Sequence, residues 1–332
     1  MSESLPLLCE TAEKLFRDLA ERQAPFAAAW AEIEAAGFPL LLTPEVEGGF
    51  GGDWQDAFAV LRIAGAHALA APLAEAIAAA HVSRRAGWAP RDGLTVIATS
   101  SAAAFVGDRF TGTVAAPWGR AATYVIARVS DRVVRLAVAD AAITESANTA
   151  GDPRDALRFD GAAAEDAADD DIALWGALAR TAQIAGALDA ALSLSITYAN
   201  ERVQFGKPIG KFQAVQQSLA EFAEEAAAVN CAGRAAACAA DCGDASMEIA
   251  AAKLRAGQAA AIGARVAHQV HGAIGFTHEH ELHRYTTRLT SWRSEYGNER
   301  SWSAYLGAWA VQQGADGLWP AIVARADVQN GS

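Results

Sequence analysis

Tyr198 to Gln213 reads YANERVQFGKPIGKFQ, and this stretch decides how the second half of the chain folds. Gly206 and Pro208 interrupt a helix, because glycine adds backbone freedom and proline lacks an amide hydrogen. On either side of the break, apolar side chains recur at helical spacing, from Ile184 to Ile196 and from Val215 to Val229. We therefore expect two long helices joined by a short turn.

The helical pattern extends over a longer region, from Ile172 to about His271. A second break falls at Gly243-Asp244, so the region predicts three long helices with the side-chain spacing of a bundle. The last of them runs into Gln269 to Glu279, which reads QVHGAIGFTHE. Its two glycines, Gly272 and Gly275, suit a helix end at which the backbone is approached closely.

The first half of the chain changes character near residue 93. Before it, residues 8–36 and Trp54 to Ala86 predict helix, with the glycine-rich loop Thr43 to Gly52 between them. After it come runs of β-branched residues separated by turn formers, which predict a small β domain. These runs are Leu94 to Ala98, Tyr124 to Val129 and Val133 to Val138. The acidic stretch Gly161 to Asp171 is expected to be the solvated start of the next helix.

The expected fold is thus mainly α-helical with a small β domain. We predict three domains, which are an N-terminal helical domain (1–92), a middle β domain (93–165) and a C-terminal helical bundle (166–332).

Charge and composition exclude several classes of protein. The formal net charge of −12 argues against nucleic-acid binding, which needs clustered lysine and arginine. Met1 to Gln23 carries several acidic residues and no long apolar run, so we expect no signal peptide, no membrane anchor and a cytoplasmic location. Three cysteines, Cys231, Cys238 and Cys242, are spaced seven and four residues apart and are interpreted as small buried side chains rather than a disulfide or metal set.

Histidines raise a metal hypothesis. His268 and His271 are three residues apart on a predicted helix, and the next three follow at ligand-like spacing at His278, His280 and His283. We expect no metal, because this stretch resembles an ordinary loop-to-helix segment of the family described next.

Three stretches make the chain resemble the acyl-CoA dehydrogenase family over nearly its whole length: Pro44 to Gly52 (PEVEGGFGG), Tyr198 to Gln213, and Gln269 to Glu279. The second and third together are specific, whereas the glycine-rich first is weak. The resemblance implies a C-terminal four-helix domain that mediates tetramer assembly, an acyl-CoA substrate, FAD as the cofactor and an electron-transfer acceptor protein.

The resemblance also implies residues that hold the ADP half of FAD, while the flavin ring sits on the neighbouring subunit. Arg202 offers a planar fork of donors to a pyrophosphate, and Phe205 offers an aromatic face to adenosine. The set is Arg202, Gln204, Phe205, Gln213, Gln269, His271, Gly272 and Gly275.

The chain departs from the family where the chemistry takes place. The family abstracts an α-proton with a glutamate, and the family spacing from Gln269 leads to Tyr296 or Gly297, with Glu295 adjacent. The other position that the family uses falls at about Gly176. Glu295 is therefore either the catalytic base or a helix-end carboxylate.

The β domain lacks the family's Thr-Glu-Pro, Gly-Ser-Asp and Trp-Ile motifs around the flavin ring, and Trp118 is a candidate with unmatched neighbours. These losses resemble the short degenerate subunits of heterotetrameric acyl-CoA dehydrogenases from bacterial steroid side-chain degradation.

Three functions remain open at this point. The first is a subunit that lends ADP-side FAD contacts to a second acyl-CoA dehydrogenase chain in an α2β2 assembly. The second is a self-sufficient homo-oligomer that uses Glu295. The third is a structural subunit without flavin.

Overall fold

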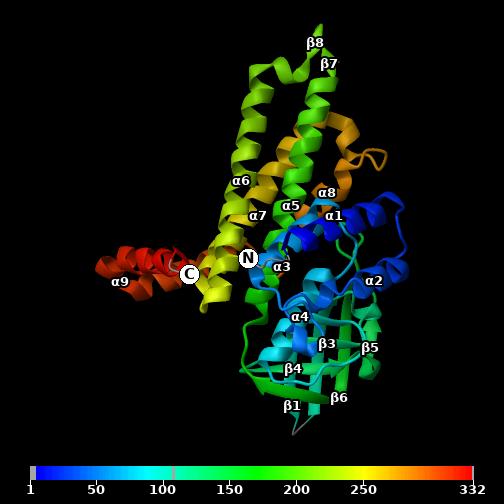
Figure 1. The fold of residues 1–332 in the computed structure, drawn as a ribbon, viewed down its shortest axis with the longest axis vertical. Coiled ribbons are helices and arrows are strands. Elements are labelled where there is room, and N and C mark those ends of the chain that lie inside the picture. The colour runs from blue at the N-terminus through cyan, green and yellow to red at the C-terminus, as the bar shows by residue number, and fades with distance from the viewer. Residues whose placement is uncertain (1–4, 107–108, 331–332) are drawn as a thin grey trace.

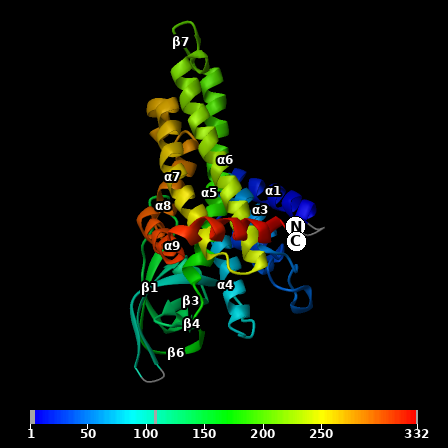
Figure 2. The same ribbon diagram turned by 90° about the vertical axis from the view of Figure 1, so that its left-hand side faces the viewer.

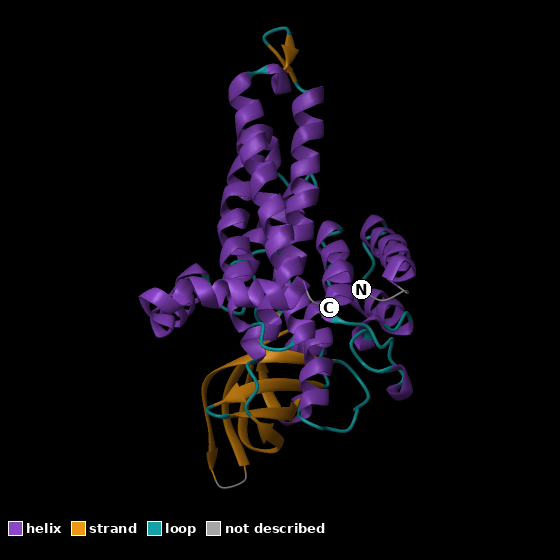
Figure 3. Cartoon of the chain, turned by 60° about the vertical axis from the view of Figure 1, so that its left-hand side comes forward, coloured by secondary structure: helices purple, strands orange, loops and turns teal. Residues whose placement is uncertain are grey.

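The computed structural model describes residues 5–106 and 109–330 and has the expected class, mainly helical with a small β region. A sheet lies at one end, long helices rise from it, and shorter N-terminal helices pack at their junction (Figures 1 and 3). The N-terminal helices are α1 (Leu5–Glu21), α2 (Phe26–Ala35), α3 (Trp54–Ala66) and α4 (Leu73–Arg85).

Two predicted helices are each interrupted. The helix expected over residues 8–36 divides into α1 and α2, because the chain turns at Gln23 with a φ of 47° and Pro25 precedes α2. Similarly, Trp54 to Ala86 divides into α3 and α4, with a φ of 47° at Ala68 and Pro72 before α4. Proline fixes its own φ and lacks an amide hydrogen, so it favours the start of a new helix over the continuation of the old one.

The β region is a sheet that closes on itself. Strand pairing runs from β2 through β1, β3, β4 and β6 and back to β2, while β5 lies beside β6. The β1–β3 pair is parallel, and the other pairs are antiparallel. The strands are β1 (Thr95–Val106), β2 (Arg109–Pro117), β3 (Tyr124–Val129), β4 (Arg132–Ala137), β5 (Ala141–Thr144) and β6 (Arg154–Ala168).

The acidic stretch Gly161 to Asp171 is mostly strand, and the expectation of a solvated helix start is wrong for its first part. β6 continues to Ala168, past the proposed domain boundary at 165/166. Its carboxylates, and those just after it, are paired with arginines of neighbouring elements. The pairs are Arg91–Glu165, Arg135–Glu165, Arg132–Asp166, Arg128–Asp169 and Arg85–Asp170.

The three long helices are confirmed as α5 (Ile172–Glu201), α6 (Gln213–Cys242) and α7 (Ser246–His271). A two-stranded hairpin, β7 (Val203–Gln204) with β8 (Lys207–Pro208), joins α5 to α6 at the far end of the bundle (Figure 1). The turn η6 (Gly272–Phe276), α8 (Leu282–Trp292) and α9 (Glu299–Asn330) follow.

The last helix, α9, extends sideways from the bundle in Figure 1 and lies across the front of it in Figure 2. Gly314 has φ 71° and ψ 171°, which are not helical values and divide α9 into two segments. Across the described residues, no helix combines the length and apolar character needed to cross a membrane.

The N-terminal helices join the bundle through a close crossing of α3 and α5. A Cβ atom on Gly65 of α3 would lie 2.0 Å from the carbonyl oxygen of Gln183, and one on Gly186 of α5 would lie 1.8 Å from the carbonyl oxygen of Arg62. Because backbone atoms cannot move aside as a flexible side chain does, both positions require glycine. This contact fixes α5, which carries a central residue of the candidate site.

We expect Gly186→Ala to separate α3 from α5 and to lower the free energy of unfolding by about 1–3 kcal/mol, as overpacking does in other cores. Chemical denaturation measures the change. Gly307→Ala is the control, because no atom lies within 4 Å of a Cβ there. Equal stability of the two variants would contradict the close crossing.

Candidate functional site

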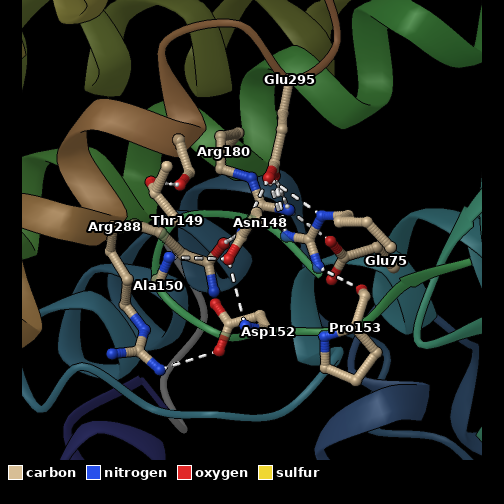
Figure 4. A network of polar contacts seen from close by, with 12 residues as sticks. Glu75, Asn148, Thr149, Ala150, Asp152, Pro153, Arg180, Arg288 and Glu295 are labelled. Carbon is tan, nitrogen blue, oxygen red and sulfur yellow. Dashed lines mark hydrogen bonds and ion pairs between the residues drawn. The ribbon is translucent and has the colours of Figure 1, made fainter. Parts of the chain in front are cut away.

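Glu295, the candidate base, lies in the turn between α8 and α9 and points into a network of charged side chains (Figure 4). Arg154 of β6 donates to it through Nε and Nη2, at 2.9 and 3.0 Å. Arg180 of α5 lies 2.8 Å from its Oε2 atom, and the amide of Asn148 donates to Oε1 at 3.2 Å. Elements from three parts of the chain therefore meet at one carboxylate.

Arg180 is the centre of this network and is only 2% exposed. It also bonds Glu75 of α4 and Gln183 of its own helix. Its guanidinium carbon lies 5.2 Å from the ring centroid of Trp292 and 5.7 Å from that of Tyr296. The carboxylates of Glu75 and Glu295 balance the positive charges of Arg180 and Arg154.

The network determines the ionisation of Glu295. Burial alone would raise the pKa of this carboxyl, but the positive charges of Arg180 and Arg154 outweigh it, and the pKa falls from 4.5 to about 2. A general base works best with a pKa near the operating pH and needs contact with its substrate. A carboxylate held by two arginines at a pKa of about 2 is better suited to a structural role.

Tyr296 fills the space beside the second position that the family uses for a base. A Cβ atom on Gly176 would lie 2.4 Å from the Tyr296 ring, so the ring occupies the notch that this glycine leaves. Tyr296 has a φ of 55°, which is uncommon for a residue with a side chain, and it is buried. The two positions at which the resemblance would place the base are thus packed against each other.

Lys253 of α7 holds the same turn from behind. Its ammonium nitrogen lies 2.9 Å from the carbonyl oxygens of both Arg293 and Gly297. Burial first, and then the positive charge of Arg180, lower the pKa of Lys253 to about 7. The backbone that presents Glu295 and Tyr296 is therefore anchored at both ends.

The β5–β6 connection closes the same region from the side of the sheet. Asp152 accepts a hydrogen bond from Arg288 of α8 at 2.8 Å, and the Thr149 hydroxyl donates to the carbonyl oxygen of Thr287 at 3.2 Å (Figure 4). Asn148, in the same connection, contacts Glu295 as described above. The β region is thereby bonded directly to the helices on which the candidate base is carried.

Trp118, the candidate for the family's flavin-ring tryptophan, packs against an N-terminal helix. Its ring stacks on Phe26 of α2 with centroids 4.5 Å apart, and the side chain is buried. Trp118 is therefore part of the hydrophobic core.

The ADP-side candidates lie at the opposite end of the bundle from the sheet. Arg202 ends α5, Gln204 and Phe205 lie in the β7–β8 hairpin, and Gln213 begins α6. All four are exposed, and Phe205 is 91% exposed with a φ of 51°. No described residue forms an ion pair with Arg202. Free donors beside an exposed aromatic ring fit a phosphate-bearing nucleotide.

The second group of candidates ends α7. Gln269 and Gly272 are exposed, and Gly272 has φ 64° and ψ −143° with no atom within 4 Å of a built Cβ. This conformation is nearly restricted to glycine, and its open side allows a ligand to approach the backbone. Gly275 is buried instead, because a Cβ there would lie 2.9 Å from the Cβ of His271.

His271 is also buried, so its ring lies beneath the loop rather than on its surface. Its assignment to the cofactor site, like those of the other seven residues and of Glu295, stays a prediction.

Four residues of the network around Glu295 escaped sequence analysis: Glu75, Arg154, Arg180 and Lys253. One signal was present for Arg180, since it is the single charged residue between Ile172 and Leu188, an otherwise uncharged helical stretch. A charge in such a position needs a buried partner of opposite charge. The identity of that partner depends on the tertiary fold.

The histidines and cysteines form no metal site among the described residues. Cys231 and Cys242 are exposed and Cys238 is partly buried, so the expectation of three buried cysteines is wrong for two of them.

Comparison with known proteins identifies relatives of this chain. Residues 171–299 match the family described as acyl-CoA dehydrogenase, C-terminal domain. The chain is 30% identical over 256 residues to acyl-CoA dehydrogenase IpdE2 of Mycobacterium tuberculosis, covering 77% of each protein. It is 35% identical over 137 residues to acyl-CoA dehydrogenase FadE27 of the same organism, covering 35% of this chain and 34% of FadE27.

Solved structures show the same fold. The ChsE4-ChsE5 complex from Mycobacterium tuberculosis contains a chain that superposes with a TM-score of 0.85 at 24% identity, over 93% of this chain and 97% of the other. A glutaryl-coenzyme A dehydrogenase superposes with a TM-score of 0.77 at 21% identity, over 92% and 95%. The chain belongs to the acyl-CoA dehydrogenase family, whose members are FAD-dependent oxidoreductases that act on acyl-CoA thioesters.

The Glu295 network predicts how stability depends on pH. Because its pKa is lower in the folded chain than the ordinary 4.5, the carboxylate stabilises the fold above pH 4.5, and this contribution is lost as pH falls from 4.5 to about 2. We expect Glu295→Gln to cost about 3–5 kcal/mol at pH 7, since the buried Arg180 and the partly buried Arg154 lose a partner, and to flatten the acid side of the profile.

Urea unfolding between pH 2 and 7 measures both effects. Glu47→Gln, at the exposed end of the short 3-10 helix Glu45–Glu47, is the control and should follow the original chain. Parallel profiles for the original chain and Glu295→Gln would show that Glu295 is not held as an ion pair.

Proposed function

We propose that this chain is the FAD-binding but non-catalytic partner subunit of an acyl-CoA dehydrogenase of the steroid side-chain type. It lends the ADP-side contacts to a second acyl-CoA dehydrogenase chain, which supplies the flavin-ring pocket and the catalytic base. Together they introduce an α,β double bond into an acyl-CoA thioester in the cytoplasm, and an electron-transfer protein reoxidises the flavin. The proposal keeps the predicted division into three domains.

One observation carries the proposal, and it is the contrast between the two ends of the bundle. At the sheet end, the negative charge of Glu295 is balanced by two arginines, and Tyr296 fills the notch at Gly176. At the hairpin end, Arg202 and Phe205 are exposed and Gly272 faces open space. The residues of this chain therefore suit a nucleotide and do not suit a flavin ring with an acyl chain.

The chemistry divides accordingly. When bound, FAD supplies the acceptor for the hydride that leaves the β-carbon of the acyl chain. Arg202 would pair with the pyrophosphate, Phe205 would pack on the adenosine part, and the amides of Gln204, Gln213 and Gln269 would donate hydrogen bonds. The proton from the α-carbon would pass to a carboxylate of the partner chain, because the pKa and packing of Glu295 suit a structural ion pair.

The α9 helix supports assembly with another chain. Between Ser301 and Ala324 only Asp316 is charged, and Val311 and Trp319 are 81% and 72% exposed. Large apolar side chains on an extended arm are a liability in a lone chain and suit a subunit interface.

The self-sufficient alternative requires Glu295 to leave its arginines and Tyr296 to leave its notch when substrate binds. The structural alternative requires that no flavin binds at all. Both are distinguished from the proposal by the flavin content of the chain with and without its partner.

We expect Arg202→Ala to weaken FAD retention in the assembled complex without unfolding it. Loss of one charge-assisted pair costs about 1.5–3 kcal/mol, or roughly a 10- to 100-fold weaker affinity. Flavin absorbance after dialysis measures retention, and Arg17→Ala on α1 is the matched control. Unchanged flavin content in Arg202→Ala would rule out the pyrophosphate assignment.

Expression with and without the product of a neighbouring gene tests assembly. Alone, the chain should be poorly soluble or a flavin-poor oligomer, because α9 and the bundle faces lack their partner. Together, the two chains should elute as an α2β2 species with about one FAD per pair, since each flavin needs one chain for its ring and the other for its ADP half. Light scattering with flavin quantification measures both. A homotetramer with one FAD per chain that oxidises acyl-CoA would favour the self-sufficient alternative, and an α2β2 complex without flavin would favour the structural one.

A further inference from the structure

Beneath the proposed nucleotide loop lies a stack of aromatic rings that the proposed chemistry does not use. His271, the last residue of α7, stacks on Tyr198 of α5 with centroids 4.5 Å apart and planes 27° apart. The edge of His280 meets His271 at 4.7 Å. This stack joins the end of α7, which carries Gln269 and Gly272, to the last turns of α5 before Arg202.

The hydrogen bonds fix where the protons of these rings lie. Nδ1 of His271 lies 2.8 Å from the carbonyl oxygen of Ala267, so Nδ1 carries the hydrogen and donates it. Its Nε2 is buried without a partner, and the ring as a whole is 3% exposed. Nδ1 of His280 accepts a hydrogen bond from the amide of Leu282 at 3.1 Å, so this nitrogen carries no hydrogen. The His271 ring fits this arrangement only when it is neutral.

A second proton on His271 would disturb the stack, because it would lie on a buried nitrogen without an acceptor.

None of the titratable groups that face His271 would stabilise a positive charge on its ring. The titratable groups that face it are Tyr198 from α5, His268 from its own helix and His280 from the turn. Burial lowers the pKa of His271 from 6.5, although its bond to Ala267 opposes the change, and His280 and His268 lower it further. No carboxylate contributes. The neutral form is therefore the one that the packing selects.

The loop is packed directly on these rings. A Cβ on Gly275 would lie 2.9 Å from the Cβ of His271 and 3.4 Å from Nδ1 of His268. The ring of Phe276 stacks on His268 at 4.0 Å. Displacement of the histidines would therefore move the η6 turn, and with it the open backbone at Gly272.

We propose that His271 is a positioning residue for the nucleotide loop, and that Gly272 to Phe276 keep their nucleotide-binding shape only while His271 is uncharged. The link to nucleotide binding rests on the proposed function, whereas the link between the rings and the loop rests on the contacts above. The expected consequence is FAD release on acidification below pH 6.5.

The test measures FAD retention by the assembled complex from pH 8 to pH 5.5, together with hydrogen exchange of the amides from Gly272 to Leu282, corrected for the intrinsic effect of pH. Retention should fall, and exchange should rise, as pH decreases. The affinity for FAD should fall by up to about tenfold for each unit by which the pKa of His271 is lower in the closed loop than in the open one. His271→Asn keeps an amide donor for Ala267 but does not titrate, so its retention and exchange profiles should be flatter between pH 8 and pH 5.5.

His280→Asn, which keeps an oxygen acceptor for Leu282, serves as the second variant if His271→Asn fails to fold. His67→Asn, at the end of α3 and paired with Glu13, is the control and should keep the original profile. An unchanged pH profile in both loop variants would overturn the proposal.

Failure of the proposed function gives a different pattern. If Arg202→Ala leaves FAD retention unchanged, this chain does not hold the nucleotide. Hydrogen exchange alone then tests whether His271 positions the loop. Acid-induced exchange that the asparagine variants abolish would then support the positioning role. Exchange that they leave unchanged would overturn it.

Discussion

The buried guanidinium of Arg180 is the constraint on which the rest of this structure depends. A positive charge inside a helical core is costly to desolvate, so it must be matched by nearby negative charge. Glu75 and Glu295 provide that charge, and Arg154 balances the second carboxylate. Since these residues lie on α4, α5, β6 and the turn after α8, satisfying one charge fixes how the helices and the sheet meet.

This solution has a consequence for function. The carboxylate next to the family's usual base position is committed to two arginines, and the tyrosine beside it fills the notch at Gly176. The turn that carries these two residues is an interior joint, and the Arg288–Asp152 pair bonds it to the sheet side. Exposed polar and aromatic groups lie at the other end of the bundle. Under the proposed function, nucleotide binding and chemistry on an acyl chain are divided between two chains of one fold.

Ion pairing shapes the sheet as well. The acidic end of β6 looked like a helix start, because aspartates commonly precede helices. In the folded chain, Glu165 and Asp166 instead face Arg135 and Arg132 of the adjacent strand β4. The alternation of apolar and charged residues along β6 is a strand pattern, but the run of alanines around it masks the period that identifies a strand.

The sequence by itself determined the three long helices and the breaks between them, because helical periodicity and glycine or proline turns depend on residues close together in the chain. It also identified the family. Only the tertiary structure decided that Glu295 is held by Arg154 and Arg180, that Tyr296 packs on Gly176, and that His271 lies under its loop. Those contacts join residues far apart in sequence, and an isolated charge carries no information about its partner until the fold brings the two together.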